Sequence, residues 1–271
     1  MPQPEARLFR LSESFTIPRA YIAPLLISGI LLAAHLSFGI LDTYTKLLAA
    51  VGAAFVTEAL LHKLVTGNWR NLSSAYVSGI SAGILVRSPM IWPFALCAAI
   101  SIASKYVFRF RGTHIFNPTN FGIVVMLLIA SDSMAVLSIQ WGNNMWAMLV
   151  IWLVGLITIW RANRMNITAV YILSFIAFAW VRSLMTGDLF MAEVAPLTGP
   201  MYQLFALFMI TDPKTTLQSK KGQSLVAFLI ALLEFFLRMG EAVYAPFYAL
   251  FIIGPIALMI ERVWFSPDDN A

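Results

Sequence analysis

Residues 242–261 read AVYAPFYALFIIGPIALMIE, an apolar run whose one charged residue is its last. A helix needs about 20 apolar residues to cross the hydrocarbon core of a bilayer. Further apolar segments precede this one, at 20–40, 46–64, 72–86, 90–106, 119–138, 145–160, 167–185, 197–211 and 223–238. The sequence therefore predicts an all-α polytopic membrane protein with about ten transmembrane helices.

The composition agrees with a chain that lies within a lipid bilayer. Hydrophobic residues make up 60% of the sequence, charged residues make up 11%, and the mean hydropathy is +0.80. Soluble domains contain about 45–50% apolar and about 25% charged residues. These values exclude a soluble enzyme, a disordered chain and a nucleic-acid-binding domain. The net charge of +5 predicts no nucleic-acid partner, because the basic residues are spread through short loops.

The distribution of Lys and Arg predicts the orientation. With the N-terminus in the cytoplasm, 14 of the 18 basic residues fall inside and four fall outside, namely Lys46, Arg87, Arg182 and Arg238. Such an excess is typical of cytoplasmic loops. We predict a bacterial cytoplasmic (inner) membrane protein with both termini in the cytoplasm. Its parts are an N-terminal tail 1–19, a single transmembrane domain 20–262 and a C-terminal tail 263–271.

Two segments, 72–86 and 197–211, are shorter than the others, and each is the third in a group of five. Short or interrupted segments at matching places in two halves indicate a binding site between repeats. We therefore expect short broken helices in two inverted five-helix repeats, at about 20–138 and 145–261.

Small polar residues precede proline at Ser88-Pro89, Asn117-Pro118 and Asp212-Pro213. This dipeptide is a signature of a helix N-cap and first turn. The free N–H groups of such an end attract anions or polar oxygens. The alternative is that proline simply starts a helix, as it does in many membrane proteins.

Two of these turns lie in segments with further common features, SKYVFRFRGTHIFNPTNFG (104–122) and FALFMITDPKTTLQSKKGQ (205–223). They resemble the RnfD/NqrB family of membrane proteins, which the Rnf electron-transport complex and the Na⁺-translocating NADH:quinone reductase share. That family has a G-K-x-x-F…G-x-x-x-F-N-P-A segment and a later F-M-x-T-D-P-x-[ST] segment. The first is matched here by Lys105, Phe108, Gly112, Phe116, Asn117 and Pro118, and the second by Met209, Thr211, Asp212, Pro213 and Thr215.

The resemblance implies a ten-helix fold, membrane electron transport and a flavin (FMN or riboflavin). Relatives with covalent FMN carry it on a Thr in an S-G-A-T motif, whereas residues 131–146 here read SDSMAVLSIQWGNNMW. We therefore expect no covalent FMN. A non-covalent flavin, a cytoplasmic flavoprotein or other membrane subunits would then supply the redox group. Coupled cation transport remains open.

The resemblance and the proline turns together select the candidate cofactor-binding residues: Lys105, Asn117, Pro118, Thr119, Thr211, Asp212 and Thr215. Asp212 is the first of these. As the N-cap of a helix it could hold a turn, accept a hydrogen bond from a flavin ring N–H, or coordinate Na⁺.

Charged residues within spans are costly and indicate function. Glu58 and His62 lie four residues apart, and Lys63 adjoins them. These residues form either a proton or cation relay, or an ion pair at the end of the helix. Glu234 and Arg238 have the same spacing. They form either a pair that neutralises both charges or an ion-coupling site. We take Glu58 and Glu234 as candidates for an ion or proton pathway.

The sequence predicts no metal site and no catalytic side chain, because Cys97 and the histidines His35, His62 and His114 are far apart. A second function is a channel or transporter for a small solute on the same fold without redox chemistry. The missing S-G-A-T motif favours it. A scaffold protein without a ligand is a third alternative.

Overall fold

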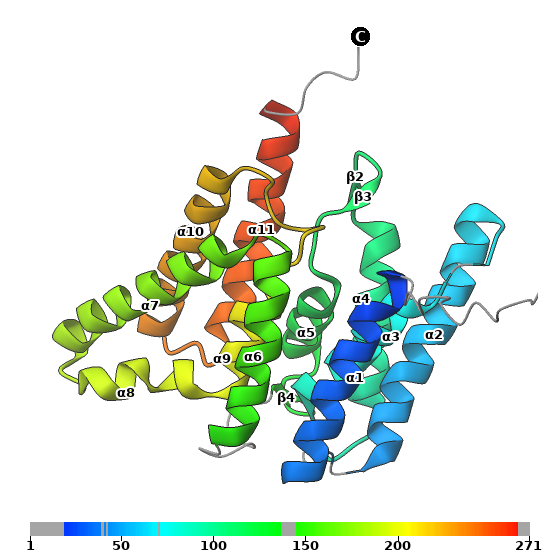
Figure 1. The fold of residues 1–271 in the computed structure, drawn as a ribbon, viewed down its shortest axis with the longest axis horizontal. Coiled ribbons are helices and arrows are strands. Elements are labelled where there is room, and N and C mark those ends of the chain that lie inside the picture. The colour runs from blue at the N-terminus through cyan, green and yellow to red at the C-terminus, as the bar shows by residue number, and fades with distance from the viewer. Residues whose placement is uncertain (1–18, 39–40, 42, 70, 137–144, 265–271) are drawn as a thin grey trace, which may run out of the picture.

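A computed structural model describes the chain except for residues 1–18, 39–40, 42, 70, 137–144 and 265–271 (Figure 1). The described part is mostly helical. Its first half contains α1 (Arg19–Phe38), α2 (Tyr44–Thr66), α3 (Ser73–Leu85), α4 (Trp92–Val107) and α5 (Pro118–Ile129). Its second half contains α6 (Met145–Arg161), α7 (Met165–Thr186), α8 (Phe190–Val194), α9 (Pro200–Leu204), α10 (Lys220–Met239) and α11 (Ala245–Trp264). A 3₁₀ turn, η1 (Ala195–Thr198), precedes α9, and a π-helical segment, η2 (Phe205–Met209), follows it.

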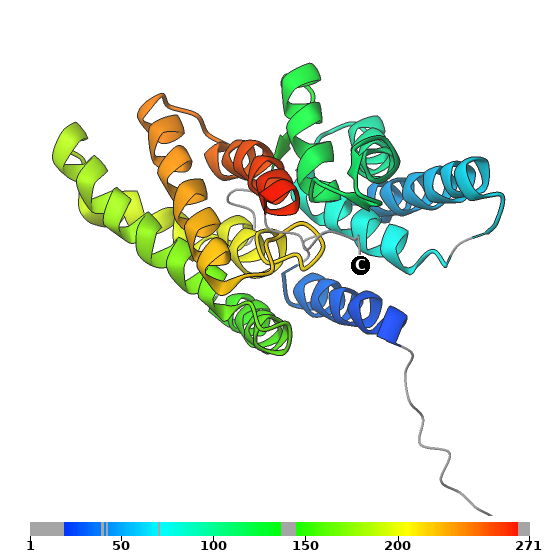
Figure 2. The same ribbon diagram turned by 90° about the horizontal axis from the view of Figure 1, so that it is seen from above.

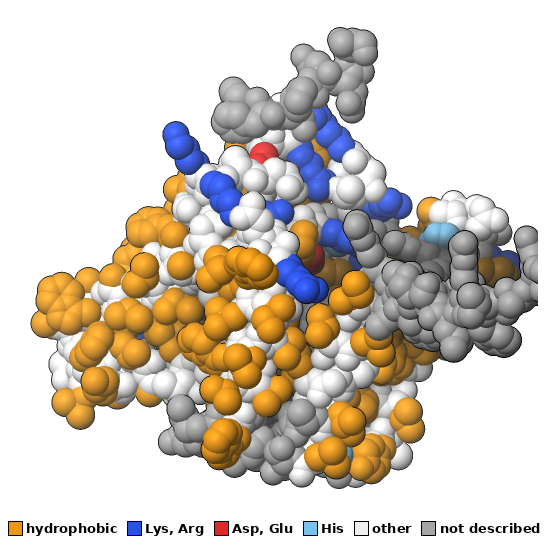
Figure 3. Space-filling view, in the orientation of Figure 1, with side chains coloured by type: hydrophobic (Ala, Val, Ile, Leu, Met, Phe, Trp, Pro, Cys, Tyr) orange, Lys and Arg blue, Asp and Glu red, His pale blue; other side chains and the backbone are white. Residues whose placement is uncertain are grey.

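Four helices, α2, α7, α10 and α11, are long and apolar enough to cross a membrane by length and composition. Large apolar side chains cover the outside of the molecule, among them Leu36 (76% exposed) and Leu64 (79% exposed). Figure 3 shows this apolar surface below an upper edge at which Lys and Arg side chains gather. A surface of this kind belongs in lipid, and the chain is a helical membrane protein.

The helices follow the predicted segments except for α8, which lies in none of them, and for two further differences. Segment 119–138 is wrong in length, because α5 ends at Ile129 and Asp132 lies exposed in the turn that follows. Segment 197–211 is divided into η1, α9 and η2, as the expectation of a short broken helix implies. The predicted tails, 1–19 and 263–271, lie mostly outside the described residues, and α11 extends to Trp264.

The helices form two groups that meet along two contacts. In the first group α2 packs on α3 and α4, and α4 packs on α5; in the second, α7 packs on α10, and α10 packs on α11. Contacts of α1 with α6 and of α5 with α11 join the groups. Figure 2 shows α7 and α10 running side by side at one end of the molecule and α2 at the other.

Helices α4 and α5 approach closely at Gly122. A Cβ at this position would lie 2.1 Å from the Ser101 Oγ and 2.5 Å from the Cys97 carbonyl oxygen. Small residues at such crossings allow backbones in a membrane to pack tightly. This contact fixes the N-terminal half of α5, where the candidate site begins.

Four two-residue strands accompany the helices, and the all-α prediction did not include them. β1 (Val86–Arg87) pairs antiparallel with β4 (Ala135–Val136), and β2 (Arg109–Phe110) pairs antiparallel with β3 (Thr113–His114). The tight β2–β3 turn uses Arg111 and Gly112, both with positive φ (47° and 81°). The hairpin lies beside the C-terminal end of α11 (Figure 1), where Arg262 Nη1 donates to the Phe110 carbonyl at 2.7 Å.

Candidate functional site

The two proline turns of the 104–122 and 205–223 segments meet in the structure. Asn117 caps α5, because its Oδ1 accepts from the Asn120 backbone N–H at 3.0 Å, and Pro118 occupies the first turn. Asn117 Nδ2 lies 3.4 Å from Asp212 Oδ2 and 3.5 Å from the Met209 carbonyl oxygen. The helix-cap prediction for Asn117-Pro118 is confirmed. We name Asn117, Asp212 and His114 the inner site.

Asp212 starts a turn, and the prediction that it caps a helix is wrong. Its Oδ1 accepts from the Lys214 N–H at 3.1 Å, and the Thr215 N–H donates to its carbonyl at 3.2 Å. The next helix begins only at Lys220, where the Ser219 side chain accepts from the Gly222 N–H. A pair of β-branched threonines follows Pro213, and such residues have low helix propensity.

Ser88-Pro89 also differs from its prediction. The Ser88 Oγ accepts from the Met90 N–H at 3.1 Å, within a turn that precedes α4. The residue at the N-cap position of α4 is Ile91, which makes no side-chain cap bond.

Threonine hydroxyls bind backbone carbonyls within the π segment and directly after it. Thr211 donates to the Leu207 carbonyl at 2.8 Å, and Thr216 donates to the Ile210 carbonyl at 2.9 Å. From α7, Thr168 donates to the Ala206 carbonyl at 2.8 Å. Buried backbone carbonyls need such partners. The Thr211 hydroxyl is therefore engaged by the backbone in this conformation.

The other predicted threonines, Thr119 and Thr215, are buried close to the two turns, with 7% and 8% of their surface exposed. Thr119 lies in the first turn of α5, and Thr215 lies in the Asp212 turn.

Lys105 pairs with Glu58 and not with the inner-site carboxylate. Its Nζ lies 2.8 Å from Glu58 Oε2 and 3.2 Å from the Ser74 Oγ, while the Tyr106 hydroxyl donates to Glu58 Oε1 at 2.9 Å. Glu58 is fully buried and Lys105 is 7% exposed. The structure thus gives Glu58 partners on α4, across the packing interface of α2.

The helix-end pairing of Glu58 with His62 and Lys63 is therefore wrong. His62 Nδ1 lies 2.9 Å from the Thr66 hydroxyl, and Lys63 Nζ lies 4.6 Å from the centre of the Trp69 ring. Both contacts are local to the end of α2. Spacing along one helix could not show that the packing of α4 on α2 offers the carboxylate a better partner.

His114 is an inner-site residue that sequence reasoning missed. It lies at the end of β3 and is half-buried. Burial lowers the pKa of His114 to about 4; Asp212 opposes this shift, and Lys214, Lys105 and Arg109 add to it. The imidazole is neutral at neutral pH, with one N–H donor and one acceptor. Its position three residues before Asn117 was the available signal.

A cluster of four phenylalanines, Phe108, Phe116, Phe121 and Phe251, lies beside Asn117. The ring centroids of Phe108 and Phe121 are 4.9 Å apart, and those of Phe116 and Phe251 are 5.0 Å apart. Phe108 remains 40% exposed. The cluster joins the hairpin end, α5 and α11, and it supplies an aromatic wall next to the polar groups.

The loop from Asp212 to Ser219 is anchored from two sides. Glu261 of α11 accepts from the Gln218 N–H at 2.9 Å, and Arg164, before α7, donates to the Leu217 carbonyl and to Gln218 Oε1. Burial lowers the pKa of Arg164, and the charges of Glu261 and Asp212 oppose this shift. The loop is held in place by these charged and polar contacts.

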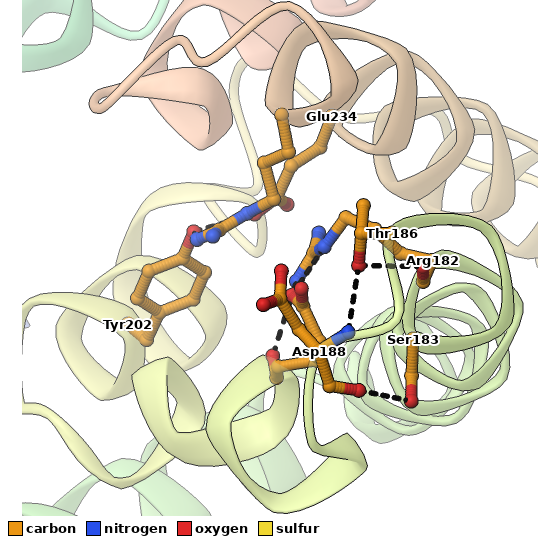
Figure 4. Close-up of polar contacts among 8 residues, drawn as sticks. Arg182, Ser183, Thr186, Asp188, Tyr202 and Glu234 are labelled. Atoms are coloured by element: carbon orange, nitrogen blue, oxygen red, sulfur yellow. Dashed lines mark hydrogen bonds and ion pairs between the residues drawn. The ribbon is translucent and has the colours of Figure 1, made fainter.

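A second polar cluster, which we name the outer cluster, contains Glu234, Tyr171, Tyr202 and Arg238. Glu234 Oε1 accepts from the Tyr202 hydroxyl at 2.5 Å and from Arg238 Nε at 3.0 Å, and Oε2 accepts from the Tyr171 hydroxyl at 2.6 Å. The predicted Glu234–Arg238 pair is confirmed. Figure 4 shows Tyr202 and Glu234 on one side and Arg182, Ser183 and Asp188 on the other.

Arg182 has its own partner next to the outer cluster. It forms an ion pair with Glu193 of α8, and its Nη2 donates to the Glu193 carbonyl at 3.2 Å. Arg182 is 4% exposed, so the arginine is held inside the molecule.

No group of three or more His, Cys, Asp or Glu side chains in the described residues could hold a metal ion. Among the predicted binding residues, the structure brings Asn117 and Asp212 together, whereas Lys105 and Glu58 form a separate pair. Comparisons with family models and with curated proteins find no match to this chain.

Proposed function

We propose that this protein is a membrane electron-transport protein that binds a flavin (FMN or riboflavin) non-covalently at the inner site. The observation that carries the proposal is the contact between Asn117 and Asp212, 3.4 Å between Nδ2 and Oδ2, which joins two segments far apart in the sequence. These segments are the ones that resemble the RnfD/NqrB family.

The chemistry of the inner site fits a flavin ring. The pyrimidine edge of a flavin alternates carbonyl acceptors with an N–H donor. Asp212 supplies an acceptor, Asn117 supplies an amide donor, and neutral His114 supplies either one. The phenylalanine cluster gives the planar ring an apolar neighbour. Lys214 and Arg109 place positive charge around His114, where a flavin phosphate would be stabilised.

When bound, the flavin would accept and release electrons, which side chains do not do readily. The residues of this chain would orient the ring, hold a proton at the His114 imidazole and exclude water. The donor would be a cytoplasmic flavoprotein or another membrane subunit, and cation transport would be the coupled process.

The proposed architecture is ten spans in two inverted repeats, 20–138 and 145–261, with both termini in the cytoplasm of a bacterial cell. Matching contacts in the two groups support it: α2 with α4 corresponds to α7 with α10, and α4 with α5 corresponds to α10 with α11. The gathering of Lys and Arg at one edge in Figure 3 supports the orientation.

The test is the visible absorption spectrum of detergent-purified protein before and after acid precipitation, with FMN or riboflavin added during purification. We expect a flavin band that moves to the supernatant. Asp212→Asn should lower flavin content while circular dichroism and gel filtration stay unchanged. Lys221→Gln, on the exposed start of α10, is the matched control and should keep the flavin.

A band retained in the pellet would contradict the non-covalent site. No band in pure, folded protein would favour the small-solute channel or transporter, which the missing S-G-A-T motif also supports. Solute flux into liposomes would then be the decisive measurement.

A further inference from the structure

The outer cluster contains an ionisable group that is fully buried in the protein. Glu234 and Tyr171 have no exposed surface, and Tyr202 is 3% exposed. All three lie on apolar helices, with Glu234 on one of the four helices able to cross a membrane. A charged side chain buried within an apolar helix of a membrane protein is costly unless it is compensated, and such residues indicate a functional role.

Arg238 connects this buried carboxylate with the surface. It lies one turn beyond Glu234 on α10, its side chain is 17% exposed, and the helix ends at Met239. Its guanidinium donates to the Tyr202 hydroxyl and lies over the rings of Phe175 and Tyr202, at 5.4 and 5.3 Å from their centres. The path from Glu234 to the end of α10 is therefore a chain of polar groups.

The cluster offers Glu234 hydrogen-bond partners whether the carboxyl group is ionised or neutral. Ionised Glu234 accepts from both tyrosines and from Arg238. Neutral Glu234 keeps both donors on Oε1 and donates its new O–H from Oε2 to the Tyr171 oxygen, in place of the hydrogen bond that Tyr171 donates to the ionised form. The charge of Arg238 then keeps its contact with the Tyr202 hydroxyl near the end of the helix, where the arginine side chain is 17% exposed.

The pair Glu58–Lys105 is a second buried carboxylate with a cation partner. The Lys105 side chain is 6% exposed and is bonded to the carboxylate and to Ser74, whereas the Arg238 side chain is 17% exposed. Breaking an ion pair is the more costly the more deeply its charges are buried. The Glu58–Lys105 pair therefore provides a control for the Glu234 site.

We propose that Glu234 is a reversible proton-binding site that opens toward the C-terminal end of α10. A hydronium ion gives up one proton and becomes water, and the proton bonds to Glu234 Oε2, where the Tyr171 oxygen accepts the new O–H. No electron moves, and Tyr202 is neutral before and after. The titratable and charged groups around the site are Tyr171 of α7, Tyr202 of α9 and Arg238 of α10, with the Arg182–Glu193 pair of α7 and α8 beside them (Figure 4).

This inference deepens the proposed function, because it names the proton as the coupled cation. Only this coupling role rests on the proposed function. By the proposed orientation, the end of α10 faces away from the cytoplasm. Proton binding and flavin binding are measured separately, so either can fail alone.

The experiment is a pH titration of the full-length protein in lipid nanodiscs, followed by infrared difference spectroscopy of the carboxylic C=O stretch. We expect a band that appears on acidification and reverses on return. It should be lost in Glu234→Gln and retained in the Glu58→Gln/Lys105→Met double variant, which removes the other buried ion pair as a whole. Tyr171→Phe, which keeps the ring, should shift the band because the acid O–H loses its acceptor.

Circular dichroism at each pH shows whether the fold persists. If Glu234→Gln does not fold, the Tyr171→Phe shift alone assigns the band. The proposal is overturned if the folded wild type shows no band that depends on Tyr171 or Glu234. It is also overturned if that band persists unchanged at every pH, because Glu234 would then not exchange its proton.

Discussion

Removing one member of the Glu58–Lys105 pair should destabilise the protein far more than removing both. The two side chains are 2.8 Å apart, Glu58 is fully buried and Lys105 is 7% exposed. A single change, Glu58→Gln or Lys105→Met, breaks this ion pair and leaves the other charge buried, at a cost of about 3–5 kcal/mol. Replacing a buried pair with apolar or neutral groups is often close to neutral.

We therefore expect the Glu58→Gln/Lys105→Met double variant to be more stable than either single variant. The coupling energy from the double-mutant cycle should be at least about 2 kcal/mol, since contacting residues couple by about 0.5–3 kcal/mol. The measurement is equilibrium unfolding in mixed detergent micelles, followed by tryptophan fluorescence. Lys63→Met is the matched control, because Lys63 is exposed and lies over a ring face. It should change stability by no more than about 1 kcal/mol.

The cycle also tests the assignment of Lys105 as a cofactor-binding residue. If its role is to compensate Glu58, the double variant keeps its flavin. If Lys105 holds the flavin, the double variant loses flavin even where it is stable. Additive effects of the two single changes would refute the pairing as the source of their cost.

Three further changes test the packing and the inner site. Gly122→Ala should cost about 1–3 kcal/mol by separating α4 from α5 at Ser101, whereas Gly52→Ala, whose Cβ meets nothing within 4 Å, should be neutral or stabilising in the same unfolding assay. Thr168→Val should cost about 1–3 kcal/mol because the Ala206 carbonyl of the π segment loses the hydroxyl that donates to it. Thr168→Ser keeps a hydroxyl and should be nearly as stable as the wild type. Equal stability of the two variants would contradict this role. The pKa of His114 falls to about 4 on folding, so the unfolded chain binds its proton first and stability should decline as pH falls from 6.5 through 4. His114→Gln should remove this part of the decline in a pH series of unfolding midpoints, and parallel curves for both proteins would contradict it.

Part of the inner site was predictable because its signals are local. Asn117-Pro118 caps α5 since an N-cap side chain and a first-turn proline depend on neighbouring residues alone. The same local pattern gave a wrong prediction at Asp212, which starts a turn and not a helix. In this turn the Thr215 N–H donates to the Asp212 carbonyl, and the Thr216 hydroxyl donates to the Ile210 carbonyl. The partner of Asn117 lies 95 residues away, and no local pattern identifies it.

The sequence by itself determined that the chain is helical and lies in a membrane, because apolar runs of about 20 residues can bury their backbone only as helices in lipid. It also determined the Glu234–Arg238 pair, because residues four apart share one helix face. Only the tertiary structure decided that Glu58 pairs with Lys105, that two tyrosines complete the Glu234 site, and that α5 ends at Ile129. These contacts depend on which helices pack together and at what height, and helical periodicity specifies a face but not the neighbour that covers it.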